Sequence, residues 1–427
     1  MGHPAPTVSL RLSFELMTSQ LKHLLLTTVE DAFDPKSWSG IPYSLRAALE
    51  RRVERLTVFR PGPPMRHPVE VAKRLILGGN PPKHPLWMTV PALKRTASEV
   101  RAEIQRVQPD AVLSISSQCV AYLERRGFER GPATAPQIFM FSDAPWLAWR
   151  QAYERWEPMP RWAARYAEDE ARAARGLDGL CFGSQWACGE ALRLYSQSGT
   201  RRDLGLSERL HVTPLGANWT PSIGREELMA RVRERSRSDM LELLFVGRDW
   251  ERKGGPLAVE VARQMQQAGQ PVRLHLVGCR PKLPESMICA KPGEGGFVTV
   301  HGLLRQDVPE ESAALEELFL RSHFLVVPTL AECYGIAFVE AQAFALPPVS
   351  RAVDALPSVI ADGVTGLVFP DGARASAYVE RMLTLWRDRE AYIAMAETAR
   401  ARFEADLSWD RTADGIVTAM ERLLPGS

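Results

Sequence analysis

Residues 324–340 read FLVVPTLAECYGIAFVE, and they indicate the fold class more clearly than any other stretch of the chain. The apolar run at 324–327 predicts a buried strand, which Pro328 ends. Gly335 lets the backbone turn, and the residues from Ile336 onward favour a helix. A strand that passes through a short loop into a helix is the repeating unit of a parallel α/β sheet.

Two glutamates frame this loop. Glu332 precedes the start of the helix, and Glu340 lies in its second turn. The first amides of a helix have no intrahelical acceptors and lie at the positive end of the helix dipole, so a phosphate or sugar oxygen fits there. One carboxylate can then reach a hydroxyl in front of the amides and the other a neighbouring sugar diol. A capped surface helix with two solvated glutamates is the alternative, and the rest of the chain decides between them.

A second strand, loop and helix lie upstream. The apolar strand at 241–246 runs into GRDWERKGG at residues 247–255, and a helix follows at about 256–267. The loop carries three cations, Arg248, Arg252 and Lys253. Ligands of open α/β sheets bind at loops that follow the carboxyl ends of parallel strands, and guanidinium and ammonium groups suit a diphosphate. Taken by itself, the loop is equally typical of a solvated turn.

Together these segments resemble the nucleotide-sugar half of the family 4 glycosyltransferases, which have the two-domain GT-B fold. The resemblance covers about residues 209–409 and rests on four motifs in the family's order: Gly247, Arg248, Lys253 and Gly254; Val300-His301-Gly302; Glu332 through Glu340; and PSVIADGVTGLV at 357–368. It implies an α/β protein of two Rossmann-like domains whose parallel sheets face each other across a cleft. The resemblance is thinner in the amino-terminal half.

The resemblance also implies roles for single residues. Arg248 and Lys253 would hold the donor diphosphate and stabilise the charge that develops on the departing nucleotide. Glu332 would contact the donor sugar, and Glu340 would bind the ribose hydroxyls. The other donor-binding positions would be Gly247, Val300 and Gly302, with the amides of Gly335, Ile336 and Ala337.

Two further candidates lie in the amino-terminal half. The loop DAFDPKSWSGIP at residues 31–42 matches the family's glycine-containing loop that closes over the donor. There Gly40 would let the backbone approach the diphosphate or the acceptor, although a plain turn would have the same sequence. After the apolar run at 137–141, many relatives have His-Asp where this chain has Ser142-Asp143. Asp143 is therefore predicted to be the catalytic base or the group that orients the acceptor hydroxyl, with the N-cap of the next helix as an equal alternative.

Alternating strands and helices predict the domain organisation. In the amino-terminal half, strands are expected at 24–26, 56–59, 111–115, 137–141 and 179–182, and helices at about 41–55, 117–126 and 184–195. The same alternation repeats after residue 241. We expect a flexible extension at 1–20, an acceptor domain at 21–215, a nucleotide-sugar domain at 216–408, and a C-terminal helix at 409–427 whose return to the first domain stays open.

Composition excludes several other classes of protein. The formal net charge of +2 over 427 residues implies no nucleic-acid partner, and no apolar stretch approaches the roughly 20 residues that cross a bilayer. Six scattered cysteines without a CxxC pair fit a reducing cytosol. We expect a cytoplasmic protein, and peripheral contact of a membrane with the arginines of the early helix stays open.

Several other signals are predicted to be structural. His211, His275, His301 and His323 lack metal-ligand spacing, and Glu168-Asp169-Glu170 is predicted to form a solvated helix face. The chain contains no Asp-x-Asp motif. We therefore expect no metal and no cofactor, because Arg248 and Lys253 supply the positive charge.

These features predict a hexosyltransferase of carbohydrate biosynthesis that moves a sugar from a nucleoside diphosphate donor to the hydroxyl of a sugar, lipid or small molecule. Retention of anomeric configuration is implied by the resemblance alone. Two alternatives remain: an epimerase or hydrolase of nucleotide sugars on the same fold, and a non-catalytic protein that binds them. The donor base and sugar, the acceptor, the oligomeric state and the choice between Met1 and Met17 as the natural start stay open.

Overall fold

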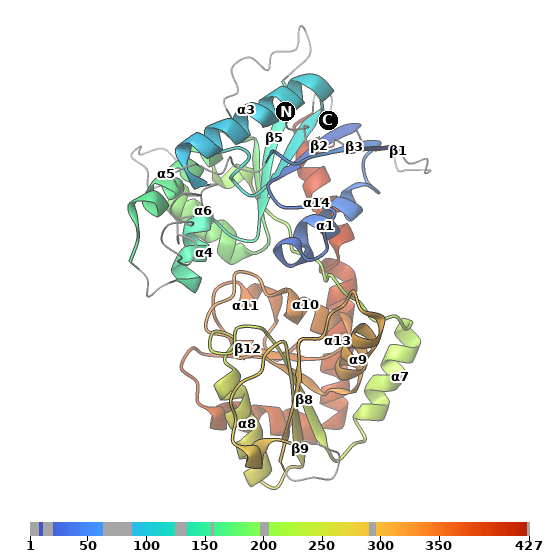
Figure 1. The fold of residues 1–427 in the computed structure, drawn as a ribbon. Helices are drawn as coiled ribbons and strands as arrows, with labels where there is room; N and C mark the ends of the chain where they lie inside the picture. Colours follow the sequence, from blue (N-terminus) through green and yellow to red (C-terminus); the bar gives the residue numbers. More distant parts are fainter. Residues whose placement is uncertain are drawn as a thin grey trace. The chain divides into compact units, whose positions relative to one another are not determined.

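The computed structural model describes residues 8–11, 20–62, 88–123, 135–154, 158–196, 205–289 and 296–424. The chain forms two compact units, Met1–Pro214 with Trp409–Ser427, and Leu215–Ser408. Each unit contains a β-sheet with helices packed on it (Figure 1). Among the described residues, no helix is long and apolar enough to cross a membrane.

The sheet of the first unit has seven strands in the described chain, in the order β1-β3-β2-β4-β5-β6-β7. The strands are β1 (Val8–Arg11), β2 (His23–Thr28), β3 (Arg55–Phe59), β4 (Ala111–Ile115), β5 (Gln137–Ser142), β6 (Gly179–Phe182) and β7 (Leu210–Val212). All neighbouring strands are parallel except β1, which pairs with β3 in the antiparallel direction. Every residue of β2, β4 and β5 is buried, as expected for the centre of a sheet that is covered on both faces.

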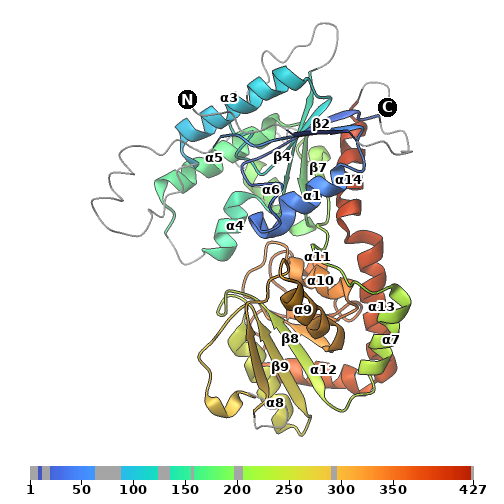
Figure 2. The ribbon, with the colours of Figure 1, turned by 45° about the vertical axis from the view of Figure 1, so that its right-hand side comes forward.

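The helices of the first unit are α1 (Ile41–Leu49), α3 (Val90–Val107), α4 (Trp146–Tyr153), α5 (Arg161–Gly176), α6 (Gln185–Ser196) and α14 (Trp409–Glu421). In the sheet, β3 lies on one side of β2 and β4 lies on the other. The chain runs from β2 to β3 and then crosses back past β2 to β4. Because such crossovers are right-handed, α1 and α3 cover opposite faces of the sheet. The last helix, α14, lies beside α1 in both views (Figures 1 and 2).

The sheet of the second unit has six strands in the described chain, all parallel, in the order β10-β9-β8-β11-β12-β13. The strands are β8 (Leu241–Val246), β9 (Val272–Val277), β10 (Val298–Gly302), β11 (Phe324–Val326), β12 (Pro348–Arg351) and β13 (Leu367–Phe369). The helices are α7 (Arg225–Arg235), α8 (Gly255–Gln267), α9 (Pro309–Arg321), α10 (Ile336–Ala343), α11 (Leu356–Val359), α12 (Ala375–Arg387) and α13 (Arg389–Asp406).

Strands β8 and β11 are neighbours, but the chain leaves them in opposite directions. From β8 it continues to β9 through α8, and from β11 to β12 through α10. The two helices therefore lie on opposite faces of the sheet, and the direction of the strand connections reverses between β8 and β11. This topological switch point is the expected ligand position of an open α/β sheet.

The structure differs from the sequence expectations in several elements. Residues Val8–Arg11 of the expected flexible extension form β1, and the rest of residues 1–19 lie outside the described residues. The helix expected at 117–126 is wrong for 117–123, which form turns, and 124–126 lie outside the described residues. Ser116 adopts a positive φ of 74°, and the hydroxyl of Ser117 binds Glu170 and Tyr166 instead of solvent. These local bonds compete with helix formation.

Candidate functional site

The two loops singled out in the sequence lie at the switch point of the second sheet, after β8 and after β11. They are fastened to each other through the backbone. Leu330 N donates to Arg252 O at 2.7 Å, and Thr329 Oγ1 donates to the same oxygen at 3.1 Å. Arg252 and Thr329 are 77 residues apart in sequence, and the two segments thus form one structure.

Gly254 permits this close approach of the loops. Its φ is +73°, and a Cβ there would lie 2.1 Å from the carbonyl oxygen of Pro328. A side chain at this position would be strained by its backbone conformation and would overlap the neighbouring loop. The glycine is therefore needed to bring the cations of one loop beside the acid of the other.

Lys253 and Arg252 converge on the carboxylate of Glu332. Lys253 Nζ donates to Glu332 Oε2, and Arg252 Nη1 lies 3.7 Å from the same oxygen. Arg252 Nη1 also donates to the carbonyl oxygen of Ala331 at 2.8 Å. Glu332 is 6% exposed, so this charged group is largely shielded from water. The stem of Lys253 lies against Gly247, where a Cβ would approach Lys253 Cγ to 2.9 Å.

Asp354 holds the backbone of Glu332, although no motif in the sequence pointed to this residue. Its Oδ2 accepts a hydrogen bond from Glu332 N at 2.9 Å, while Ala355 N donates to Glu332 O at 3.3 Å. Asp354 has a φ of 47°, a left-handed conformation that aspartate tolerates better than most residues. The signal that identifies Asp354 is the positive φ of a non-glycine residue next to a predicted site. This signal is visible only in the structure.

The helix α10 begins immediately after this cluster. Gly335 precedes it with φ 90° and ψ 67°, and a Cβ there would lie 3.0 Å from Glu332 Cγ. The first amides of the helix, at Ile336 and Ala337, have no intrahelical acceptor. Both residues are partly exposed, so the amides are positioned to bind an anionic or sugar oxygen.

Glu340 lies one turn further along α10 and is partly buried. Among the described residues, none forms a hydrogen bond or ion pair with its carboxylate. Loss of hydration without a compensating charge raises the pKa of Glu340 to about 8. The group is therefore largely protonated at neutral pH, and hydroxyl donors would favour its ionised form.

Arg248, by contrast, is exposed, and no described residue forms a hydrogen bond or ion pair with its side chain. The cation that joins Lys253 at Glu332 is Arg252, which the sequence showed in the loop without assigning it a role. Arg252 also donates to Asp249 from its backbone N at 3.1 Å and from Nε at 3.2 Å. These bonds fix its direction, while Arg248 remains available to a ligand.

A glycine lies at the carboxyl end of each of the strands β8, β9 and β10. Gly278 N donates to Gly302 O at 2.7 Å, and a Cβ on Gly278 would lie 2.8 Å from Gly247 O. The predicted positions Val300 and Gly302 belong to β10, with Gly302 at φ +71° against the side chain of Arg280. The carboxyl ends of β8, β9 and β10 thus carry bare backbone at Gly247, Gly278 and Gly302.

Gly40 and Asp143 belong to the first unit. Gly40 has a φ of 79° and precedes α1, and the two residues before it, Trp38 and Ser39, are also left-handed. Asp143 follows β5, and its Oδ1 accepts from Ala144 N at 2.8 Å. The alternative that Asp143 is an N-cap is wrong, because Pro145 occupies the N-cap of α4. The catalytic role of Asp143 stays a prediction.

The prediction that residues 168–170 form a solvated face is wrong for two of the three. Asp169 is 1% exposed and Glu170 is 4% exposed. Glu170 accepts from Ser117 Oγ at 2.8 Å and from Trp146 N at 3.0 Å, and burial raises its pKa to about 7. The side chain of Glu170 therefore binds the first amide of α4, a contact that helical periodicity does not reveal.

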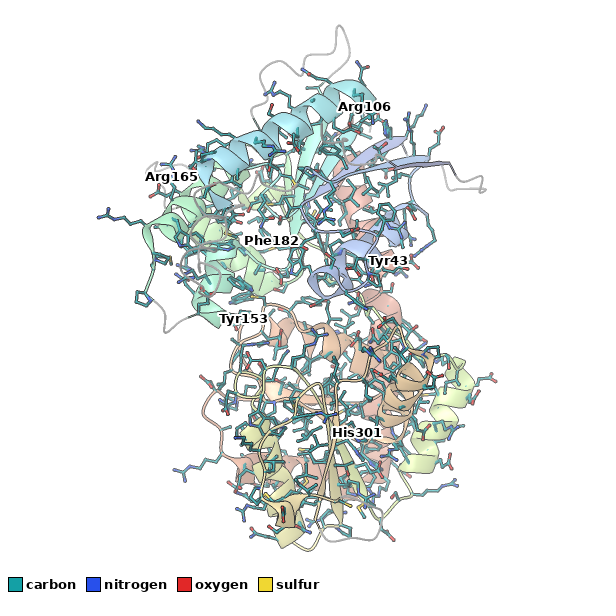
Figure 3. All side chains as sticks on the ribbon, in the orientation of Figure 1. Tyr43, Arg106, Tyr153, Arg165, Phe182 and His301 are labelled. Atoms are coloured by element: carbon teal, nitrogen blue, oxygen red, sulfur yellow. The ribbon has the colours of Figure 1, made fainter. Side chains whose placement is uncertain are left out.

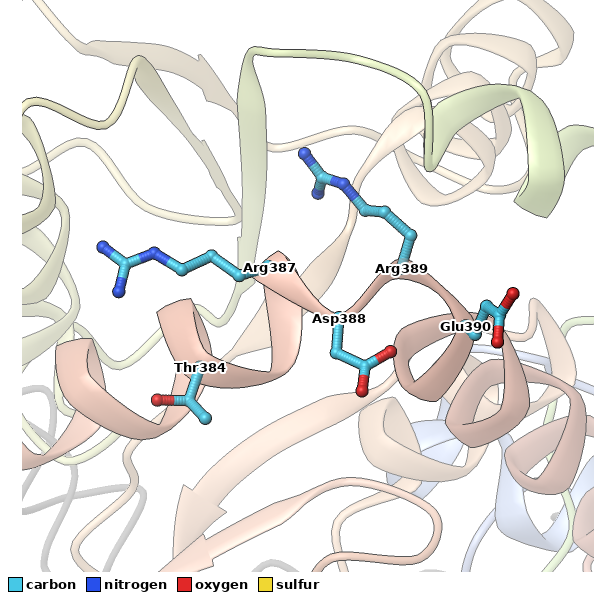
Figure 4. Close-up of a pocket in the computed structure, with 5 residues that line it drawn as sticks. All are labelled: Thr384, Arg387, Asp388, Arg389 and Glu390. Atoms are coloured by element: carbon cyan, nitrogen blue, oxygen red, sulfur yellow. The ribbon is translucent and has the colours of Figure 1, made fainter.

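In the part of the chain that the structure describes, no group of three or more His, Cys, Asp or Glu side chains could hold a metal ion. A surface hollow lies where α12 meets α13 and is lined by Thr384, Arg387, Asp388, Arg389 and Glu390 (Figure 4). It shares no residue with the cluster at Glu332.

Comparison with known proteins gives a match in the second unit. Residues 241–388 match the family model described as Glycosyl transferases group 1. The D-inositol 3-phosphate glycosyltransferase of Geodermatophilus obscurus is 30% identical over 219 residues, which are 49% of this chain and 47% of the relative. The chain thus spans about half the length of the curated relatives that it matches. The resemblance to family 4 glycosyltransferases is confirmed.

Solved structures are similar over nearly the whole chain. Sucrose-phosphate synthase from Thermosynechococcus elongatus has a TM-score of 0.61 at 16% identity, covering 95% of this chain and 100% of that one. The Anabaena protein HepE, in complex with UDP and glucose, has a TM-score of 0.56 at 13% identity with the same coverages. At these identities the likeness establishes the fold, and the predicted GT-B fold is confirmed.

Proposed function

We infer from the group 1 glycosyltransferase segment at residues 241–388 and from the GT-B fold that this protein is a glycosyltransferase. It moves a sugar from a nucleoside diphosphate to the hydroxyl group of an acceptor. The cluster of Arg252, Lys253 and Glu332 at the switch point of the second sheet is the observation that carries this proposal. The complex of HepE with UDP supports a nucleoside diphosphate as the departing group.

The cluster provides what the departure of a nucleotide requires. When the bond between the sugar and the diphosphate breaks, negative charge accumulates on the phosphate oxygens. Lys253, held in place by Glu332, and Arg248, exposed in the same loop, supply positive charge at that position. The first amides of α10 add donors for a phosphate or sugar oxygen. No metal ion or cofactor is required for this stabilisation.

Further roles follow from the family resemblance. Glu340 binds the ribose diol, and Glu332 orients both the cations and the donor sugar. The first unit recognises the acceptor, with Gly40 in a loop of left-handed backbone and Asp143 as the group that orients or deprotonates the acceptor hydroxyl. The sugar is transferred with retention of anomeric configuration. We place the protein in the cytoplasm, where its six buried, free cysteines stay reduced.

The proposal is tested by incubating the purified chain with a panel of nucleotide sugars and hydroxyl acceptors. We expect release of a nucleoside diphosphate that depends on the acceptor, together with an acceptor whose mass has increased by one sugar. Lys253→Ala, in which transfer should be slower, serves as the comparison. Release of nucleotide without an acceptor product would favour a hydrolase, and an isomerised donor would favour an epimerase. Donor binding without any turnover would favour a non-catalytic binding protein.

A further inference from the structure

Glu170, in α5, joins two loops at the carboxyl edge of the first sheet. Its Oε1 accepts a hydrogen bond from Ser117 Oγ at 2.8 Å, in the loop after β4. Its Oε2 accepts from Trp146 N at 3.0 Å, at the first residue of α4, which follows β5. Helices α4 and α5 pack against each other (Figure 3, in which Tyr153 marks the end of α4 and Arg165 the first turns of α5). The carboxylate thus bridges the loops after two neighbouring strands, β4 and β5.

The first turn of α4 depends on this bond. The N-cap residue of α4 is Pro145, and the helix has no side-chain cap of its own. The first amides of a helix lack intrahelical acceptors, and a negative charge is favourable beside them. Glu170 supplies both an acceptor for the amide of Trp146 and the negative charge. It therefore caps α4 from a neighbouring helix.

Asp143 lies in the segment that this bond holds. The segment leaves β5 at Ser142, whose Oγ donates to Ala144 O at 2.9 Å. Asp143 Oδ1 accepts from Ala144 N at 2.8 Å. Two residues further along, the amide of Trp146 binds Glu170. The strand therefore fixes one end of the segment, and Glu170 fixes the other.

Glu170 is buried without a counter-ion among the described residues. It is 4% exposed, and no described cation lies within ion-pair distance of its carboxylate. The adjacent Asp169 is 1% exposed, but Arg165 Nε lies 3.3 Å and Arg172 Nη2 2.9 Å from its Oδ1. Burying a carboxylate without a cation is costly, and such groups are concentrated at functional sites. The cost at Glu170 is explained if the fold needs the charge where the two loops meet.

We propose that Glu170 is a positioning residue for the acceptor: its ionised carboxylate holds the start of α4 and thereby directs Asp143 toward the acceptor hydroxyl. This rests on the proposed function, which assigns the acceptor to the first unit. An ionised carboxylate accepts from Ser117 and Trp146 at once, and hydrogen bonds to a charged acceptor are the stronger ones. A protonated carboxyl has one oxygen that must donate, so it holds the two loops less tightly.

The pH range of this effect follows from the surroundings of the carboxylate. Burial raises the pKa of Glu170 to about 7, because its hydrogen bonds offset only part of the lost hydration. The other titratable side chains around it, on α5, α6 and the loop after β4, are Tyr166, Tyr195 and Cys119. Burial raises the pKa of all three, so they stay neutral near pH 7. Arg150, the charged residue of α4, binds Glu154. Since the unfolded chain releases the proton of Glu170 near pH 4.5, its ionisation lowers the free energy of unfolding as pH rises from 4.5 to 7.

Glu170→Gln separates positioning from support of the fold. Its amide can accept from Trp146 N and donate to Ser117 Oγ, but it carries no charge. At pH 8 the unfolding temperature should therefore rise, because a buried charge is removed. The kcat/KM for the acceptor should fall about tenfold, the ratio typical of one weakened charge-assisted hydrogen bond. Nucleoside diphosphate affinity should stay unchanged. Glu168→Gln, at an exposed position of the same helix, is the matched control and should change none of the three.

Hydrogen exchange on the full chain tests the same contact without an acceptor. Mass spectrometry measures protection factors, corrected for the intrinsic pH dependence of exchange, in the peptide that contains residues 143–150. In the wild-type protein these should rise between pH 6 and pH 8, as Glu170 ionises. In Glu170→Gln they should be independent of pH.

The outcomes separate this inference from the proposed function. Wild-type protection factors that do not change with pH would overturn the inference and need no variant. A lower unfolding temperature of Glu170→Gln at pH 8 would show that Glu170 only supports the fold. An unchanged kcat/KM for the acceptor in this variant would overturn the positioning role while glycosyl transfer stands. Absence of transfer by the wild-type protein to any acceptor would overturn the proposed function, and this inference with it.

Discussion

At the scale of single residues, the proposed donor site depends most on Lys253. Its ammonium group contacts a carboxylate that is 6% exposed, and its stem lies against Gly247, so both its charge and its direction are determined by neighbours. Arg248 shares the loop but has no such neighbours among the described residues. A cation that is already positioned stabilises developing charge without reorganising during the reaction.

Lys253→Ala should therefore weaken nucleoside diphosphate binding and slow transfer, by roughly 2 to 4 kcal/mol in total. Titration calorimetry and initial rates measure the two effects. Lys94→Ala, which removes the same charge from an exposed position in α3, is the matched control and should change neither. Wild-type turnover in Lys253→Ala would show that the cluster at Glu332 does not act on the donor.

The proposed contact of Glu340 with the ribose predicts that nucleotide binding depends on pH. Its pKa is raised from 4.5 to about 8, so the folded protein retains a proton between these values that the unfolded chain has lost. The free energy of unfolding should accordingly fall as pH rises through this range. In the proposed contact, ribose hydroxyls donate to the ionised carboxylate, so a bound nucleotide should lower the pKa of Glu340 and release a proton.

We therefore expect nucleotide affinity to rise as pH increases toward 8. Calorimetry at pH 7 in two buffers with different ionisation enthalpies measures the proton release directly. Glu340→Gln, which keeps the shape and loses the titration, should bind more weakly and release no proton from this position. Equal proton release in the variant would mean that another group titrates.

At the scale of elements, two loops far apart in sequence form one site because a glycine lets them touch. Gly254 places its backbone against Pro328, and Asp354 in the loop after β12 holds Glu332 from the other side. The strand and helix that flank each loop were predictable from hydrophobic periodicity and turn residues. The contacts between loops were not, because they depend on strand order.

Gly254→Ala should destabilise the protein and weaken donor binding. Gly363→Ala is the matched control, since Gly363 has nearly the same φ of +74° but open space where a Cβ would lie. Gly363→Ala should lower the free energy of unfolding by about 1 to 2 kcal/mol, because alanine is strained in the left-handed conformation. Gly254→Ala adds an overlap with Pro328 O at 2.1 Å, so its unfolding temperature should fall further. Equal losses in thermal denaturation would show that the loops can separate freely.

At the scale of the whole molecule, the chain leaves the first unit at Pro214 and returns to it at Trp409. The returning helix α14 buries Ile416 and Met420 completely, and Arg52 binds both Asp410 and Asp414. Thr412 Oγ1 also donates to Pro214 O at 2.5 Å. Helix α14 therefore belongs to the core of the first unit.

Truncation after Ser408 should destabilise the first unit and spare the second. Each large apolar side chain that loses its burial costs roughly 1.5 to 3 kcal/mol. Hydrogen exchange should become faster in β6, β7 and α1, and remain unchanged in β8, β9 and α8. Binding of a nucleoside diphosphate by the second unit should persist. Faster exchange throughout Leu215–Ser408 would show that the two units do not fold independently.

Local sequence determined the building blocks of this protein. Apolar runs, glycines and prolines predicted each strand, loop and helix around residues 241–267 and 324–346, because the preferences involved act over a few neighbouring residues. Tertiary structure alone decided that β8 lies beside β11, that Arg252 rather than Arg248 approaches Glu332 and that Glu170 is buried. Each of these depends on contacts between side chains or strands that are distant in the sequence, where periodicity carries no information.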